Sequence, residues 1–297
     1  MNHLENHNCP SCSKILKGYP SVVPEKDPTR EFKIQKHMWM GLSKKKMFFP
    51  YYRCKCGLLT TKTFFKEKFL KYLYSDMDDN TYKNDNKTND IKTKKGYLEQ
   101  IEKLLDQGNK KLNVLEIGGD NGNFIKIMKD FNPSLSFSIV EPNKSMHKKL
   151  KLLTKNVYLN IKQIPSTKKF DLIIAIHVFD HIPSLNLFVK KLSNKLKKSG
   201  YIYGVVHNEK SLMATLLGNR WPAYSLQHPH VFNPSSINSL FSRLNFKKNF
   251  IIRTNNYFNL GFLIQNLFAV IFRKEINLPS LFPIGLKLGN ISFLYKK

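Results

Sequence analysis

From about residue 94, short apolar segments alternate with longer segments whose apolar residues recur every three or four positions. Apolar residues at that spacing lie on one face of a helix, whereas a short run of consecutive apolar residues is typical of a buried strand. The expected strands are 113–117, 136–140, 170–176 and 201–206, and the expected helices are 97–105, 124–131 and 185–196. Strands that alternate with helices predict an α/β fold with a doubly wound, mostly parallel sheet.

Three regions of different composition divide the chain. Residues 1–75 carry all four cysteines and end in a segment, 61–75, whose apolar residues have roughly helical spacing. Residues 76–93 are polar and rich in Asn and Asp, which predicts a linker. Residues 94–297 hold the alternating pattern. We therefore predict a cysteine module with a connecting helix, a linker, and a larger α/β domain.

Length and composition exclude several classes of protein. The chain has 297 residues, of which 41% are hydrophobic, and it contains no uninterrupted apolar run of the length that spans a membrane. Its N-terminus is polar and has no signal-peptide core. The four cysteines are expected to be thiols in a reducing compartment. These features predict a globular cytoplasmic protein.

The charge is strongly basic, with 49 Lys and Arg against 21 Asp and Glu and a formal net charge of +28. Only six of the basic residues are Arg. Because base recognition and phosphate clamping favour the planar guanidinium of Arg, we do not expect a nucleic-acid partner. Two interpretations remain open. Either the surplus Lys is a solvated background of a Lys- and Asn-rich composition, or it attracts anionic ligands such as phosphorylated substrates.

The most informative segment is 114–124, in which an expected strand runs into a Gly-rich turn and then a helix. Ligands of open α/β sheets bind at such strand ends. The dinucleotide pattern G-x-G-x-x-G, begun at Gly118, requires glycine where Asp120 and Asn123 stand. An acidic turn suits a cationic or amine-bearing ligand instead. Glu141 ends the next strand, where a carboxylate either accepts the two ribose hydroxyls of a nucleoside or is simply solvated.

The turn resembles motif I of class I S-adenosylmethionine-dependent methyltransferases, E/D-x-G-x-G-x-G, with Asp120 at the middle glycine. Residues 170–182 resemble that family's F-D-x-I-x-x-x-x-V-x-E-H-I stretch, with Asp180 in place of Glu. Residues 217–237 resemble the G-x-x-W … H-x-H-x-F-[ST] segment of many bacterial methyltransferases, and residues 289–297 the family's last, antiparallel strand. The resemblance covers about residues 95–250 and implies a Rossmann-like methyltransferase fold.

The resemblance also implies which residues hold S-adenosylmethionine and which lie beside its methyl group. Methyl transfer to a hydroxyl or amine is helped by removal of the acceptor's proton, which a neutral histidine can take. His181 and His230 are the leading candidate bases, followed by His177, although each could instead only shape the pocket through hydrogen bonds. The candidate cofactor-binding residues are Glu116, Gly118, Gly119, Asp120, Gly122, Phe124, Glu141, Pro142, Asn143 and His177.

The cysteines form two close pairs, C-x-x-C at Cys9 and Cys12 and C-x-C-G at Cys54 and Cys56. Four thiolates so arranged suit a closed, tetrahedral structural Zn²⁺ site. The layout resembles a small zinc-binding domain found N-terminal to some methyltransferases, in which the second pair is usually C-x-x-C-G. Unligated thiols are the main alternative. A redox pair is the other, but it needs a βαβ context that this region lacks.

The apolar segment 257–272 is too short and interrupted to span a bilayer, and it is expected either to cover the substrate pocket or to lie at a membrane interface. Together, these features predict an enzyme that transfers a methyl group from S-adenosylmethionine to a small-molecule acceptor. The expected acceptor is a phosphorylated, nucleotide-linked or lipid-linked sugar of glycan biosynthesis, with peripheral membrane contact. The alternative is a weak or inactive methyltransferase-like module that binds an anionic polymer.

Overall fold

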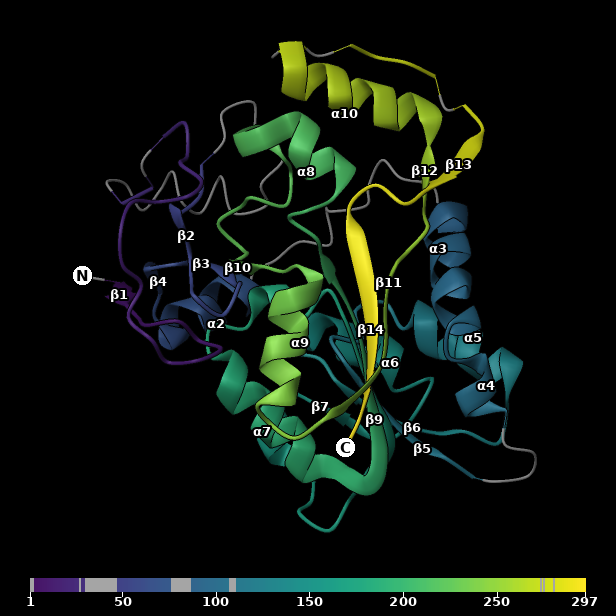
Figure 1. Ribbon diagram of the computed structural model, residues 1–297. Coiled ribbons are helices and arrows are strands. Elements are labelled where there is room, and N and C mark those ends of the chain that lie inside the picture. Colours follow the sequence, from purple (N-terminus) through teal and green to yellow (C-terminus); the bar gives the residue numbers. More distant parts are fainter. Residues whose placement is uncertain are drawn as a thin grey trace.

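The computed structural model describes residues 3–26, 28–29, 47–75, 87–106, 111–272, 274, 276–279 and 281–297. Its centre is a seven-stranded sheet (Figure 1). The neighbouring strands β9, β8, β5, β6 and β7 pair in parallel, and β14 pairs antiparallel with both β9 and β11. The predicted doubly wound, mostly parallel sheet is therefore confirmed. In spatial order the strands are β11 (Lys247–Arg253), β14 (Asn290–Lys296), β9 (Leu196–His207), β8 (Phe170–Ile176), β5 (Asn113–Ile117), β6 (Ser136–Val140) and β7 (Val157–Tyr158).

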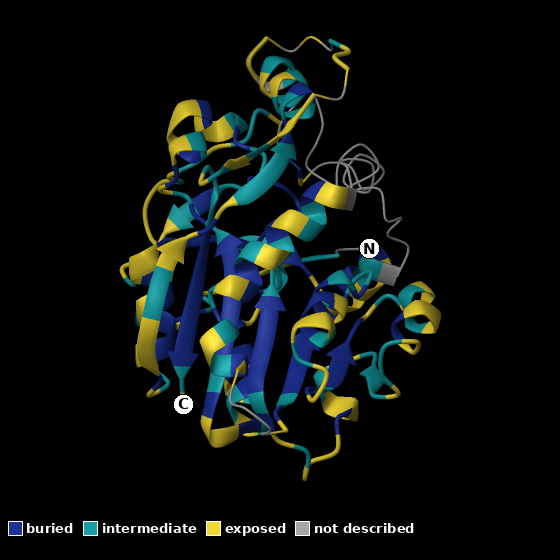
Figure 2. Cartoon of the chain, turned by 90° about the vertical axis from the view of Figure 1, so that its right-hand side faces the viewer, coloured by how far each residue is buried: buried dark blue, intermediate teal, exposed yellow. Residues whose placement is uncertain are grey.

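Helices cover both faces of the sheet, and its central strands are among the most buried parts of the chain (Figure 2). The alternation of side chains along β8 shows how the two faces are filled: Leu172 and Ile174 pack into one hydrophobic cluster, and Ile173 and Ala175 into the other. The first cluster is completed by α3 (Lys87–Glu99), α4 (Glu102–Leu105) and α5 (Asn123–Phe131), the second by α7 (Leu185–Lys195) and α9 (Pro234–Ser242).

The N-terminal residues are joined to this domain by backbone pairing. Strand β3 (Leu59–Thr61) lies between β2 (Tyr51–Arg53) and β10 (His230–Val231), so one small sheet contains strands from both ends of the chain. Cys9 and Cys54 belong to the same hydrophobic cluster as α7 and α9. The cysteine region is thus packed against the α/β domain along an extended contact.

Two parts of the predicted organisation differ in the structure. The helix expected over 61–75 is replaced at its start by β4 (Thr63–Phe65), which pairs with β1 (Leu4–Asn6), and α2 covers only Glu67–Ser75. Phe64 and Phe65 are both buried and belong to one hydrophobic cluster that also contains Leu70 and Leu73 of α2. Residues 87–93 of the predicted linker form the start of α3, while residues 76–86 lie outside the described residues.

Some elements that follow β9 lie above the carboxyl ends of the parallel strands (Figure 1). They are α8 (Leu212–Leu217), α10 (Leu260–Phe272), and the hairpin of β12 (Asn256–Asn259) with β13 (Pro283–Leu286). Among the described residues, no helix combines the length and apolar character needed to cross a membrane. The remaining short helices are α6 (His147–Leu150), η1 (Lys144–Met146), η2 (Ile161–Gln163), η3 (Phe179–His181) and η4 (Gly218–Arg220).

Candidate active site

The Gly-rich turn connects the end of β5 to the start of α5. Gly118 and Gly122 have φ of +73° and +77°, a left-handed backbone that glycine adopts without strain. Asp120 also has a positive φ, 45°. Asp tolerates this conformation better than most residues, which accounts for an Asp at the motif's middle glycine position. At Gly119 the reason for glycine is space, because a Cβ would lie 2.4 Å from Cγ2 of Ile139 on β6.

Glu141 follows β6 and ties this turn to the neighbouring strand end. Its Oε2 accepts a hydrogen bond from the Asp120 amide (2.9 Å) and its Oε1 accepts one from the Asn143 amide (2.8 Å). Burial raises the pKa of Glu141, while the two amide hydrogen bonds act in the opposite direction. Each carboxylate oxygen keeps a second lone pair, so the group can hold the turn and still accept hydrogen bonds from a ligand.

We expect Glu141→Ala to weaken S-adenosylmethionine binding by about 1–3 kcal/mol, since charge-assisted hydrogen bonds both to a ligand and to the turn are lost. Isothermal titration of the variant measures the change. Glu141→Gln separates the two roles, because it keeps an oxygen for one backbone amide but removes the charge. Glu99→Ala, at an exposed position of α3, is the control. An unchanged dissociation constant in Glu141→Ala would show that another residue holds the ribose.

The chemistry of the turn fits a cationic nucleoside such as S-adenosylmethionine. Glu116, Asp120 and Glu141 are close enough to interact electrostatically, and buried Oε2 of Glu116 has no hydrogen-bond partner among the described residues. Burial raises the pKa of Glu116 to about 8. A buried acid without a partner is stabilised by a ligand that brings a positive charge or a donor. The turn, Glu116 and Glu141 are therefore the residues that would hold the cofactor.

The other predicted cofactor residues have different environments. Phe124 is buried in the core on α5, and Pro142 is exposed beside Glu141. Asn143 caps η1, where its side chain accepts a hydrogen bond from the Ser145 amide. His177 follows β8 with a φ of 52°, and its buried Nδ1 has no hydrogen-bond partner among the described residues. His177 thus lies at the carboxyl end of the strand next to β5, beside the turn.

Asp180 lies at the centre of a group of histidines above β8 and β9. Its Oδ2 is 3.0 Å from Nδ1 of His207 and 3.7 Å from Nδ1 of His177. Burial alone would raise the pKa of Asp180, but the neighbouring His207 and His177 hold it well below its usual range. The Asp180 carboxyl group is fully buried, and these neighbours favour its ionised form.

The two leading candidate bases, His181 and His230, have their ring nitrogens engaged by other groups. His230 Nε2 contacts the Ile182 carbonyl at 2.7 Å and its Nδ1 contacts Thr60 Oγ1 at 2.9 Å. His181 Nδ1 is 3.0 Å from the hydroxyl of Tyr74, and a backbone hydrogen bond with Gln227 adds a second contact. Burial lowers the pKa of His181 to about 4 and that of His230 to about 3. In this arrangement both rings are neutral and position neighbouring segments.

The profile of the family described as "Methyltransferase domain" matches residues 90–249, more than half of the chain. The chain belongs to this family. It is an S-adenosylmethionine-dependent methyltransferase, and the matched range contains the Gly-rich turn, Glu141 and the Asp180 group. A search of curated proteins finds no match.

Several solved structures are similar to this methyltransferase over part of its chain. They include a SAM-dependent methyltransferase from Archaeoglobus fulgidus, with 18% identity, a TM-score of 0.47, and coverage of 69% of this chain and 94% of that one. The YcgJ protein from Bacillus subtilis has 18% identity, a TM-score of 0.48, and coverage of 68% and 97%. The plantazolicin methyltransferase BpumL, in complex with SAH, has 13% identity, a TM-score of 0.46, and coverage of 71% and 84%.

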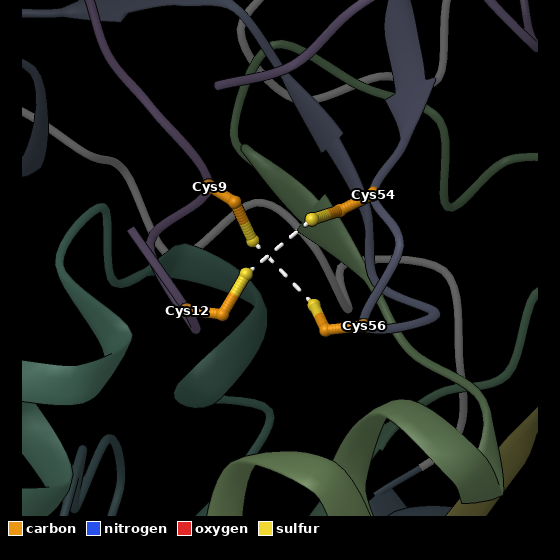
Figure 3. A group of neighbouring side chains, drawn as sticks. All are labelled: Cys9, Cys12, Cys54 and Cys56. Carbon is orange, nitrogen blue, oxygen red and sulfur yellow. Dashed lines mark hydrogen bonds between the residues drawn. The ribbon is translucent and has the colours of Figure 1, made fainter. Parts of the chain in front are cut away.

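The methyltransferase also brings its four cysteines together (Figure 3). The Sγ atoms of Cys9 and Cys56 are 3.6 Å apart and those of Cys12 and Cys54 are 3.4 Å apart, and all four lie within 4.8 Å of one another. These separations exceed a disulfide bond of about 2.05 Å and approach the roughly 3.8 Å between sulfurs around a tetrahedral zinc ion. Despite its short C-x-C spacing, the second pair reaches the same point as the first.

Sequence reasoning missed His207 and Tyr74 and treated Asp180 only as a replacement for Glu. His207 is the last residue of β9. A histidine at the carboxyl end of a predicted parallel strand could have indicated a site residue, because ligands bind at these strand ends. Tyr74 gives no comparable signal, because it reaches His181 from α2, more than 100 residues earlier in the methyltransferase chain. The N-terminal residues therefore contribute directly to the surroundings of the site.

Proposed function

We propose that the acceptor of this methyltransferase is a small molecule, an anionic or activated carbohydrate such as a nucleotide-linked or lipid-linked sugar. The observation that carries the proposal is the set of exposed apolar residues on α8 and α10. Both helices lie beyond the carboxyl ends of the parallel strands (Figure 1). Folded proteins rarely expose many large apolar side chains together unless the surface has a ligand or partner. The exposed residues on these helices are Leu212, Leu216, Ile264, Leu267, Ile271 and Phe272.

The charge of this surface supports an anionic acceptor. Lys210, Lys274 and Lys287 are exposed next to or shortly after these apolar elements, and the whole chain has a net charge of +28. Arg220 holds α10 in place, since its Nη1 donates to the Ile271 carbonyl at 3.1 Å while its Nε pairs with Glu25 at 3.2 Å. An apolar surface bordered by lysines suits a ligand that combines a lipid or nucleoside with phosphate.

The residues of the site have different roles in methyl transfer. S-adenosylmethionine, when bound, supplies a methyl group on a positively charged sulfur. The Gly-rich turn and Glu141 position the nucleoside, Asp120 places negative charge beside it, and Glu116 offers a buried carboxyl group without a hydrogen-bond partner among the described residues. Positioning and desolvation of the acceptor are the main contributions that such a site makes to the rate.

A substrate screen at two ionic strengths tests the proposed acceptor. We expect nucleoside-diphosphate sugars to be methylated, with kcat/KM falling several-fold between about 0.01 M and 0.15 M salt, because the Debye length falls from about 30 Å to about 8 Å. Neutral phenols and amines serve as the matched acceptors without phosphate. A preference for these, or a flat salt profile, would contradict the carbohydrate proposal and leave the methyltransferase assignment intact.

We also propose that the cysteine group binds one structural zinc ion. The support is the convergence of four sulfurs and the direction of the surrounding amides. Backbone hydrogen bonds from Ser11 and Cys12 reach the Cys9 sulfur, and one from Leu58 reaches the Cys56 sulfur. Amides that point at sulfur stabilise thiolates, the form in which cysteine binds zinc. Gly57, with a φ of +88°, allows the turn that presents the second pair.

A further inference from the structure

Asp180 and His207 form a pair that the assigned site residues do not include. Asp180, in η3, is fully buried, and one of its oxygens accepts hydrogen bonds from both Nδ1 (3.0 Å) and the backbone amide (3.3 Å) of His207. Because an ionised carboxylate only accepts hydrogen bonds, Nδ1 of His207 must carry a proton. The neutral ring then has its free lone pair on Nε2, on the edge that faces away from Asp180.

His207 is the histidine of this group best placed to accept a proton. Its side chain is 24% exposed, and Nε2 has no hydrogen-bond partner among the described residues, whereas both nitrogens of His230 are engaged. The His228 ring is fully buried, and its Nδ1 contacts the Ala223 carbonyl at 2.7 Å. The His207 ring contacts two neighbouring histidines at tilted angles, with its centroid 4.7 Å from that of His177 and 4.8 Å from that of His228.

We propose that His207 is the general base of the methyl transfer and that Asp180 is the residue that positions it. This inference rests on the proposed transfer to an acceptor hydroxyl or amine. The bond that forms joins the acceptor oxygen or nitrogen to the methyl carbon. The bond that breaks joins that carbon to sulfur, and its electron pair stays on sulfur. The acceptor's proton moves to His207 Nε2, and the resulting imidazolium is stabilised by Asp180 until the proton passes to water.

Two observations connect the pair to the rest of the site. Asp180, in η3, follows the carboxyl end of β8, and His207 is the last residue of the adjacent parallel strand β9. Strand β8 also lies next to β5, the strand that ends in the Gly-rich turn. The backbone at His177, between β8 and Asp180, is left-handed, a conformation that is uncommon for a non-glycine residue and concentrates at functional sites. The titratable side chains that face His207 are Asp180, His177 and His228, with His181 behind them.

Nitrogen NMR of the imidazole rings tests the pair without an acceptor. We expect full-length protein with S-adenosylmethionine to show His207 as the Nδ1–H tautomer, and Asp180→Asn to shift the ring toward the Nε2–H form. Asp171→Asn, which removes a carboxylate at the other end of the same strand, should leave the His207 signals unchanged. If His207 of the wild-type protein is the Nε2–H tautomer, the proposal is overturned, whichever acceptor the substrate screen identifies.

Kinetics with the acceptor that turns over in the screen provide the second readout. His207→Asn keeps a donor for Asp180 but has no base, and we expect kcat to fall about 10²–10⁴-fold with the cofactor dissociation constant and acceptor KM little changed. If the Asp180→Asn variant does not fold, the His207→Asn variant still tests the proposal, because the His207 side chain is partly exposed. An unchanged kcat would overturn the role of His207.

A third outcome would also overturn the proposal. The ligand atoms of His177, Asp180 and His207 lie within 4.8 Å of one another, so a cation could take the place of the proton. Mn²⁺ at micromolar concentration would then broaden the signals of both His177 and His207, and Asp180→Asn would abolish that broadening. The two hydrogen bonds from His207 to one Asp180 oxygen favour the proton, and we expect no broadening.

Discussion

Gly119→Ala is expected to lower kcat/KM about 100-fold or more and to weaken S-adenosylmethionine binding. The added Cβ would lie 2.4 Å from Cγ2 of Ile139, a fully buried residue of β6. Overpacking at such a place costs about 1–3 kcal/mol. If the turn moves instead, the ligand is misplaced, and a displacement of about 1 Å can cost about 100-fold in rate. Calorimetric titration and thermal unfolding measure the two effects.

Gly96→Ala is the matched control for this substitution. Gly96 lies within α3, and a Cβ there would meet no atom within 4 Å. Replacing an unconstrained glycine inside a helix by alanine stabilises a protein by about 0.5–1 kcal/mol, so this variant should bind the cofactor normally and unfold at a slightly higher temperature. If Gly119→Ala binds S-adenosylmethionine as tightly as Gly96→Ala, the turn adapts to the extra methyl group and the steric argument is wrong.

Loss of zinc is expected to have the second large effect. We expect the purified protein to contain about one zinc ion per chain, and Cys9→Ser or chelation to lower the unfolding temperature of the whole chain by 10 °C or more, by analogy with other structural zinc sites. The reason is the shared architecture: Cys9 and Cys54 pack in the same cluster as the helices of the α/β domain. Elemental analysis and calorimetry check both parts.

We expect the loss of zinc to affect the histidine group as well. Strand β3 follows the Cys54–Cys56 turn and pairs with β10. Thr60 of β3 contacts His230 of β10. We therefore expect the ring signals of His230 to change when zinc is removed. Lys14→Ala, an exposed change in the first cysteine loop, keeps all four sulfurs and is the control. Purified protein without stoichiometric zinc, or an unfolding temperature unaffected by Cys9→Ser, would contradict the zinc proposal.

Much of the sheet and the Gly-rich turn could be predicted because local sequence patterns specify both. The strands expected at 113–117, 136–140 and 170–176 form at those residues, since a buried parallel strand must be apolar at almost every position. The turn after β5 needs small or left-handed residues over only a few positions, and Gly118, Asp120 and Gly122 supply them. Periodicity and backbone preference act over neighbours in sequence, so a single sequence reveals them.

The contacts that complete the site were decided by the tertiary structure alone. Asp180 and His207 are 27 residues apart and meet because β8 and β9 are neighbours in the sheet. Thr60 reaches His230, and Tyr74 reaches His181, across more than 100 residues, which requires the N-terminal strands to pair with β10. No local pattern specifies such partners, because any exposed strand edge offers the same backbone groups and the choice is made by the packing of the whole chain. Sequence alone therefore determined where the Gly-rich turn forms, and packing determined which histidine has a buried carboxylate beside it.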